Sequence, residues 1–191
     1  MAALTIPTLL QNTNQAELKV AWKRNFASLS SAFLQLANEK GGSIKGLYTA
    51  DYDGAAQLAN DLSTKLSYIK KCTGYTEIQG NCFVSAYTGG DRTLGFVLSN
   101  GALIDIVIIT QNCDNGTPGD PTNWGGRCGM ILTDVNGFKK PNAYGQDTFA
   151  ASYMLDGRVV PYGSQQDGGG GYLMGVCPSD PGVCAAKYLY E

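Results

Sequence analysis

Side chains with oxygen donors gather in one stretch of the chain, residues 134–147 (DVNGFKKPNAYGQD). Asp134, Asn136, Asn142 and Asp147 are interspersed with turn-forming residues, as in loops that hold hard cations. Calcium takes about six to eight oxygen ligands in proteins, so we expect a candidate calcium site here. The competing interpretation is a loop whose Asp and Asn side chains cap their own backbone. Calcium is the one cofactor that the residues suggest, and the sequence leaves both interpretations open.

The cysteine and histidine counts limit the chemistry further, because the chain has six cysteines and no histidine. Catalysis by Ser-His or Cys-His pairs and zinc sites that contain histidine are excluded. The carboxylates fall in predicted turns, and nothing arranges a partner that would raise the pKa of one of them. We therefore expect no catalytic residue and no enzymatic activity.

The cysteines form three close pairs along the chain, and these are Cys72 with Cys82, Cys113 with Cys128, and Cys177 with Cys184. No Cys-x-x-Cys spacing occurs, which disfavours a zinc ribbon or a thioredoxin-type redox motif. Each close pair brackets a Gly-rich or polar loop, so among the many possible pairings we expect disulfides in sequence order. Disulfides persist in oxidising compartments, which indicates the periplasm, the cell surface or the exterior.

Charge and hydropathy constrain the partners. The net charge of the 191 residues is −2, and 16 % of them are charged. Without a basic excess to displace counterions, we expect no nucleic-acid partner. The chain shows neither an apolar run of membrane-spanning length nor a signal peptide with a charged first region. Since disulfides imply export, we expect the natural chain to begin upstream of Met1.

The elements that must position these residues start with a long amphipathic helix, predicted from Leu9 to Lys40. Its apolar positions recur at steps of three and four and so share one face of a helix; they are Leu18, Trp22, Phe26, Leu29, Phe33 and Leu36. Polar side chains occupy the predicted opposite face, namely Glu17, Lys19, Lys23, Arg24, Asn25 and Gln35. The pair Gly41-Gly42 supplies a stop signal.

The N-terminal stretch that includes the start of this helix, residues 2–26 (AALTIPTLLQNTNQAELKVAWKRNF), resembles the end of the class III signal region of type IV pilin-like proteins. In that family a basic leader is cleaved, and an apolar run with a glutamate leads into Ala-Ala-x-x-Ile-Pro. Ala2, Ala3, Ile6 and Pro7 match the end of this pattern, whereas the leader and the glutamate are absent. Residues 134–147 also resemble the Asp-x-Asn-Gly…Pro-Asn…Gly-x-Asp stretch of pseudopilin-like proteins.

The resemblance implies several properties. The helix, with Pro7 and the apolar positions from Leu18 to Leu36, would mediate assembly into a filament with copies of this chain and other pilin-like subunits. A segment upstream of residue 1 would anchor the subunit in the bacterial inner membrane before assembly. A disulfide between Cys177 and Cys184 would staple the C-terminal region. In the related major pseudopilins of type II secretion a nearby loop binds calcium, although its residue order differs from that of residues 134–147.

The remainder of the chain predicts a sheet. A second helix is expected from Gly54 to about Lys71 with Asp53 as its N-cap. Alternating and β-branched runs then predict strands near residues 94–98, 103–110, 130–133, 149–155 and 158–160, with Asn100-Gly101 as a type I′ hairpin turn. The predicted class is α+β, a long N-terminal helix packed on an antiparallel sheet of about four strands. We expect residues 1–42 to form the helix and residues 43–191 the head domain.

Two functions remain open. The first is a structural subunit of a type IV pilus-like or type II secretion pseudopilus filament, located in the bacterial cell envelope and then in a periplasmic or extracellular filament. The second is a secreted or tip-located adhesin-like module that binds through disulfide-tied loops. Asp114, Asp120 and Trp124 in the loop between Cys113 and Cys128 are the candidate binding residues.

Overall fold

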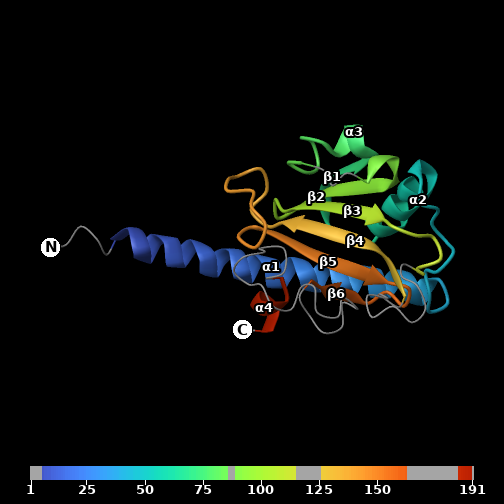
Figure 1. Cartoon of the computed structure of the whole chain (residues 1–191), viewed down its shortest axis with the longest axis horizontal. Coiled ribbons are helices and arrows are strands. Elements are labelled where there is room, and N and C mark those ends of the chain that lie inside the picture. The colour runs from blue at the N-terminus through green and yellow to red at the C-terminus, as the bar shows by residue number, and fades with distance from the viewer. Residues whose placement is uncertain (1–5, 86–88, 115–125, 163–184, 191) are drawn as a thin grey trace.

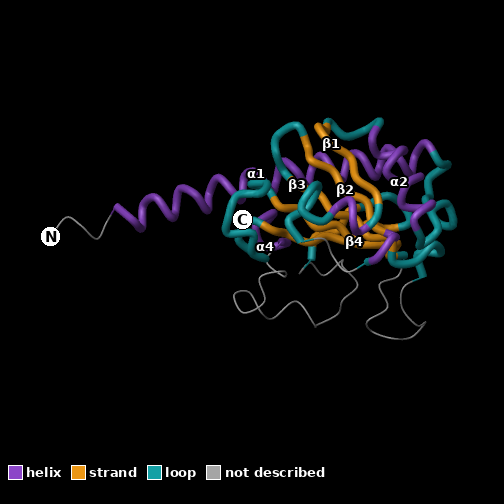
Figure 2. Tube along the Cα trace, turned by 90° about the horizontal axis from the view of Figure 1, so that it is seen from above, coloured by secondary structure: helices purple, strands orange, loops and turns teal. Residues whose placement is uncertain are grey.

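Helix α1 (Ile6–Glu39) extends well beyond the rest of the molecule. The computed structural model describes residues 6–85, 89–114, 126–162 and 185–190, with the side chains of α1 from residue 15 onward. The strands lie across the C-terminal part of α1, while its N-terminal part projects from the domain (Figure 1). The same projection is visible in the view turned by 90° (Figure 2). No helix in these ranges has the length and apolarity that a membrane span requires.

The end of α1 confirms the stop signal. Gly41 takes a φ of 83°, which residues with a side chain rarely adopt. The N–H of Gly42 then donates to the carbonyl of Ala37 at 2.8 Å, and that of Gly41 to Asn38 at 3.2 Å. This pair of bonds is the Schellman arrangement, which satisfies the last carbonyls of a helix.

Helix α2 (Tyr52–Ser63) is shorter than predicted. Its N-cap is Asp51, whose carboxylate accepts the N–H of Gly54 at 2.9 Å, so the assignment of Asp53 was wrong by two residues. The segment that follows is strand β1 (Tyr68–Thr73), which pairs with β2. Ile69, which falls within the range predicted as helix, lies on this strand with 70 % of its surface exposed.

One sheet of six strands organises the domain, rather than about four. Its order is β1-β2-β3-β4-β5-β6, and every neighbouring pair is antiparallel. The remaining strands are β2 (Thr93–Leu98), β3 (Leu103–Ile108), β4 (Arg127–Asp134), β5 (Thr148–Met154) and β6 (Val159–Pro161). The edge strand β6 corresponds to the short run predicted near residues 158–160, whereas the other edge strand, β1, was not predicted. The short helices are α3 (Tyr75–Ile78), η1 (Gly90–Arg92) and α4 (Ala185–Tyr190).

The β2–β3 hairpin forms at Asn100-Gly101 as predicted, but with a different turn. Leu98 pairs with Ala102, and Gly101 donates its N–H to the Leu98 carbonyl at 2.9 Å. Only Gly101 of the two turn residues has positive φ, at 88°. A three-residue loop with glycine in the left-handed region replaces the type I′ turn. This loop directs the β2–β3 turn toward α1, since the side chain of Asn100 bonds Asn25.

The main core lies between α1 and the sheet. Alternate residues of the strands face the helix, among them Phe96, Ile106, Ile131, Phe149 and Tyr153. Phe33 stacks on Tyr153 with ring centroids 4.7 Å apart, and Trp22 stacks on Phe149 at 5.0 Å. Gly157 lets the β5–β6 turn approach the helix, because a Cβ there would lie 2.5 Å from the Phe33 carbonyl oxygen. A smaller core on the opposite face of the sheet includes Ile78, Leu103 and Leu132.

Candidate functional site

The predicted apolar face of α1 lies against the sheet. Trp22, Leu29, Phe33 and Leu36 are completely buried, while Leu18 and Phe26 are partly buried against the same core. The indole Nε1 of Trp22 donates to the carbonyl of Ala185 at 2.9 Å, which attaches α4 to α1. Pro7 is the second residue of α1, and its side chain lies outside the described part. These six side chains therefore belong to the fold of the head.

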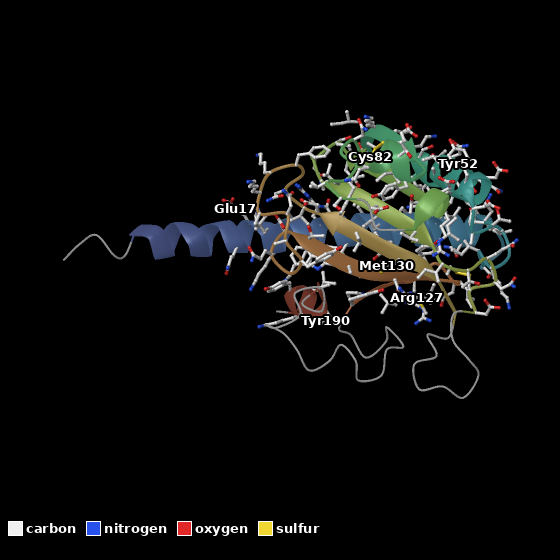
Figure 3. All side chains as sticks on the ribbon, turned by 45° about the horizontal axis from the view of Figure 1, so that its top comes forward. Glu17, Tyr52, Cys82, Arg127, Met130 and Tyr190 are labelled. Carbon is white, nitrogen blue, oxygen red and sulfur yellow. A yellow bond between two sulfur atoms is a disulfide. The ribbon has the colours of Figure 1, made fainter. Side chains whose placement is uncertain are left out.

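The other face of α1 carries exposed apolar side chains. Val20 is 66 % exposed and Leu34 48 % exposed. A hollow of about 420 Å³ lies along the helix, lined by Ala16, Glu17, Val20, Ala21 and Arg24. Glu17 marks the region where the helix leaves the domain (Figure 3). An exposed valine surrounded by alanines can contribute to a contact with another apolar surface.

Two of the three expected disulfides lie in the described part. Cys72 of β1 is bonded to Cys82, and Cys113 is bonded to Cys128 of β4. The first bridge, whose Cys82 is labelled in Figure 3, packs with Ile78 and Leu103 in the smaller core. Both pairings confirm the sequence order. Cys177 and Cys184 lie outside the described residues, as do Asp120 and Trp124 of the predicted binding loop.

The four predicted cation ligands come together between β4 and β5. Asp147 is completely buried and organises the loop. One carboxylate oxygen accepts the N–H of Ala143 at 2.6 Å, and the other accepts Asn142 N–H at 2.8 Å and Asn136 Nδ2–H at 3.0 Å. The side chains thus cap the loop backbone, as the competing interpretation required. Asp147 has little capacity left for a cation.

Asp134 is held more loosely. It is 1 % exposed, and its oxygens accept long bonds of 3.3 Å from Asn136 N–H and Thr148 Oγ1–H, together with a bond from the backbone N–H of Gly137. Burial and, to a smaller extent, the nearby Asp147 carboxylate together raise the pKa of this carboxyl to about 7. The sequence analysis expected no partner that would raise a carboxyl pKa, and this expectation was wrong for Asp134. A buried carboxyl in this state requires either a proton or a cation.

The amide of Asn142 satisfies its neighbours when its Nδ2 points inward. The inward atom of this amide lies 3.1 Å from Asp134 Oδ2 and 3.1 Å from the carbonyl oxygen of Lys139. If that atom is Nδ2, it donates to both oxygens and no ion is needed. If it is Oδ1, three acceptors converge, and a cation must hold them together. A cavity of about 70 Å³ adjoins Asp134, Asn142 and Thr148.

The donor set that fits a cation therefore differs from the predicted one. Asp134 and Asn142 remain, the Lys139 carbonyl and the Thr148 hydroxyl join them, and Asp147 serves the loop instead. Asn136 donates Nδ2–H to Asp147, while its buried Oδ1 accepts no hydrogen bond from the described residues. Sequence reasoning missed Lys139 because a backbone carbonyl carries no residue-type signal. Across the described ranges, no three Asp, Glu, Cys or His side chains gather to hold a metal. A cation here would be bound mainly by neutral oxygens.

One residue of α1 lies on a different face of the helix from the one predicted. Asn25 was predicted on the polar face, but it is 1 % exposed. Residues advance by about 100° around a helix, which places Asn25 at the border of the apolar face, one turn before Leu29. Its Oδ1 accepts the side-chain N–H of Asn100 at 2.7 Å. The pairing of Asn25 with a turn 75 residues away has no local signal in the sequence.

Comparison with known proteins gives no further assignment. Neither family models, nor curated proteins, nor solved structures match this chain.

Proposed function

We propose that this chain is a structural subunit of a type IV pilus-like or type II secretion pseudopilus filament, and that it assembles through α1. The observation that carries the proposal is that α1 has two apolar faces, one buried and one exposed. The face that contains Trp22 and Phe33 is buried against the head. Val20 and Leu34 lie close to them in the sequence but on the exposed face. A helix that served only the head would not need the second apolar surface.

The length of α1 supports the same function. The helix has 34 residues, which correspond to about 51 Å at 1.5 Å per residue. The longest strand, β4, has eight residues, or about 26 Å at 3.3 Å per residue. The sheet can therefore cover only about half of the helix, and the projecting half is free for contacts with neighbouring subunits (Figure 1).

The resemblance of Ala2, Ala3, Ile6 and Pro7 to the pilin-like signal region provides the remaining support. On this proposal the subunit is first anchored in the bacterial inner membrane by a segment upstream of residue 1. It then joins a periplasmic or extracellular filament with other copies and pilin-like subunits. Its role is assembly without catalysis and without nucleic acid. A basic leader encoded upstream would agree with this, whereas a conventional signal peptide would contradict it.

The test is a change on the outward face of α1. The Val20→Asp variant is expressed in a strain that lacks the gene. Incorporation of the variant into filaments, measured by electron microscopy and immunolabelling, should be abolished or strongly reduced relative to the wild type. The purified variant should melt as the wild type does, because Val20 contributes little to the head. Ser31→Asp, an exposed position on the same helix, is the matched control. Normal incorporation of the Val20→Asp chain would overturn the proposal.

Calcium binding at Asp134 is a second candidate function, favoured by the burial of this carboxyl and by the cavity of about 70 Å³ that adjoins it. The ion would join the loop after β4 to the start of β5 and would stabilise the head. The adhesin-like alternative depends on the loop closed by Cys113 and Cys128, of which residues 115–125 lie outside the described part. That alternative stays a prediction.

A further inference from the structure

A polar hollow, separate from the one beside Val20, lies between α1 and the β2–β3 turn. It measures about 260 Å³ and is lined by Arg24, Asn25, Ser28, Ser67, Leu98, Ser99 and Asn100. We call it the α1–turn groove. Its walls come from three segments far apart in the sequence, which the fold brings together. None of the lining residues is acidic, so hydrogen-bond donors and one positive charge determine its chemistry.

The orientation of the Asn25 amide is fixed by a chain of hydrogen bonds. Ala102 N–H donates to Asn100 Oδ1 at 3.0 Å, which leaves Asn100 Nδ2 to donate to Asn25 Oδ1 at 2.7 Å. The remaining end of the Asn25 amide is therefore Nδ2, a donor. This atom is buried and has no hydrogen-bond partner in the described part of the chain. Buried donors in folded proteins are almost always satisfied, so an acceptor is expected there.

The neighbours of Asn25 add charge and further donors. Arg24 is exposed, and no ion pair involves it within the described ranges. The hydroxyls of Ser67 and Ser99 lie 2.7 Å apart, and one donates to the other. The second hydroxyl keeps its hydrogen for a ligand. A planar guanidinium beside fixed N–H and O–H donors is the arrangement that binds carboxylate and phosphate oxygens.

We propose that the α1–turn groove is a binding site for an oxyanion, a carboxylate or a phosphate group. Arg24 supplies the charge, and Asn25 Nδ2 supplies a donor whose direction is set by Asn100. The anion can come from solution or from an acidic side chain of a second copy of this chain. The inference does not rest on the filament proposal, because a free anion would occupy the same donors in the isolated subunit.

Side-chain NMR signals give the direct test on the full chain. The Asn25 side-chain NH₂ and Arg24 Nε–H signals are followed while acetate or inorganic phosphate is added, with chloride at equal ionic strength as the reference. We expect saturable shifts of both signals with a Kd of about 1–10 mM, weak as suits a single exposed charge. Arg24→Gln should weaken binding at least about tenfold. Lys23→Gln removes a neighbouring positive charge that does not line the groove, and it should change the Kd less than about twofold.

A dilution series without added anion separates the two sources. If the ligand is the carboxylate of another copy, the Asn25 signal shifts with protein concentration, and Arg24→Gln removes that dependence. If the ligand is a free anion, the signal is independent of protein concentration and responds to acetate or phosphate. Either result supports the site. The proposal is overturned if neither titration moves the two signals saturably, or if Arg24→Gln binds as tightly as the wild type.

Discussion

The helix–sheet interface and the two aspartates at the ends of the β4–β5 loop are both buried but are held in place by different forces. At the interface, Trp22 and Phe33 are completely buried among aromatic rings. In the loop, Asp134 and Asp147 are buried among amides, hydroxyls and each other. Burial of apolar area is not directional and does not depend on ionisation, whereas a buried carboxylate needs particular donors. The stability of the interface should therefore be independent of pH and of added cations, whereas the stability of the loop should depend on both.

The largest expected effect on stability comes from a substitution in the helix–sheet interface. Trp22→Ala removes a completely buried indole and its bond to the Ala185 carbonyl. It should lower the free energy of unfolding by about 3–5 kcal/mol, and the loss should be the same at pH 5 and pH 8. Urea denaturation measures both values.

Val20→Ala is the matched control for this change, since Val20 lies on the same helix with 66 % exposure. It should alter stability by less than about 0.5 kcal/mol. If the loss of unfolding free energy caused by Trp22→Ala varied strongly with pH, the proposed difference in pH response between the interface and the loop would be wrong.

The pH dependence of the loop should be nearly as large. The pKa of Asp134 is raised by burial and by Asp147 from 3.8 to about 7. Between pH 4 and 7 the folded state therefore binds more protons than the unfolded state, so stability falls as pH rises and levels off above pH 7. The loss amounts to at most about 4 kcal/mol. Urea denaturation in EDTA from pH 4.5 to 8.5 measures it.

Asp134→Asn isolates this contribution, because the amide resembles the protonated carboxyl in shape. The difference in stability between variant and wild type should grow with pH in favour of the variant. Other carboxyls with shifted pKa values, such as Asp51 and Asp114, affect both proteins equally. Parallel stability curves for the two proteins would show that Asp134 is ionised without cost.

The hydrogen bonds of Asp147 provide the next test. Asp147→Ala leaves the N–H groups of Asn142 and Ala143 and the Asn136 amide without their acceptor. We expect a loss of about 2–3 kcal/mol. Asp156→Ala is the control, since Asp156 also accepts a backbone N–H in a turn, at 3.1 Å from Arg158, but is 39 % exposed. It should cost less than about 1 kcal/mol. Equal losses would mean that burial does not distinguish the two turns.

The same contrast explains what the sequence could predict. The buried face of α1 and the two described disulfides were predictable, since a periodic apolar pattern and close cysteine pairs are local signals. Strand β1 was mistaken for helix because Tyr68–Thr73 is short and acquires its structure by pairing with β2. The loop residues were found, and Asp147 caps the backbone as one of the two open interpretations predicted, but the sequence could not decide between them. Whether an Asp oxygen faces an N–H or a cation depends on backbone groups such as the Lys139 carbonyl, which no residue type reveals.

Calcium should produce the smallest effect, and it decides how the Asn142 amide is oriented. With Oδ1 inward, Asp134, Asn142 and the Lys139 carbonyl oxygen bind the ion. A site with one carboxylate among neutral oxygens should have a Kd of about 1 mM, as in extracellular modules. At ten times that concentration the ion stabilises the head by about 1.4 kcal/mol, a rise in Tm of about 3–5 °C. Asp134→Asn should remove the rise, and Asp114→Asn, an exposed carboxylate in another loop, should keep it. If calcium and EDTA give the same Tm in the wild type, Nδ2 faces inward and the loop needs no ion.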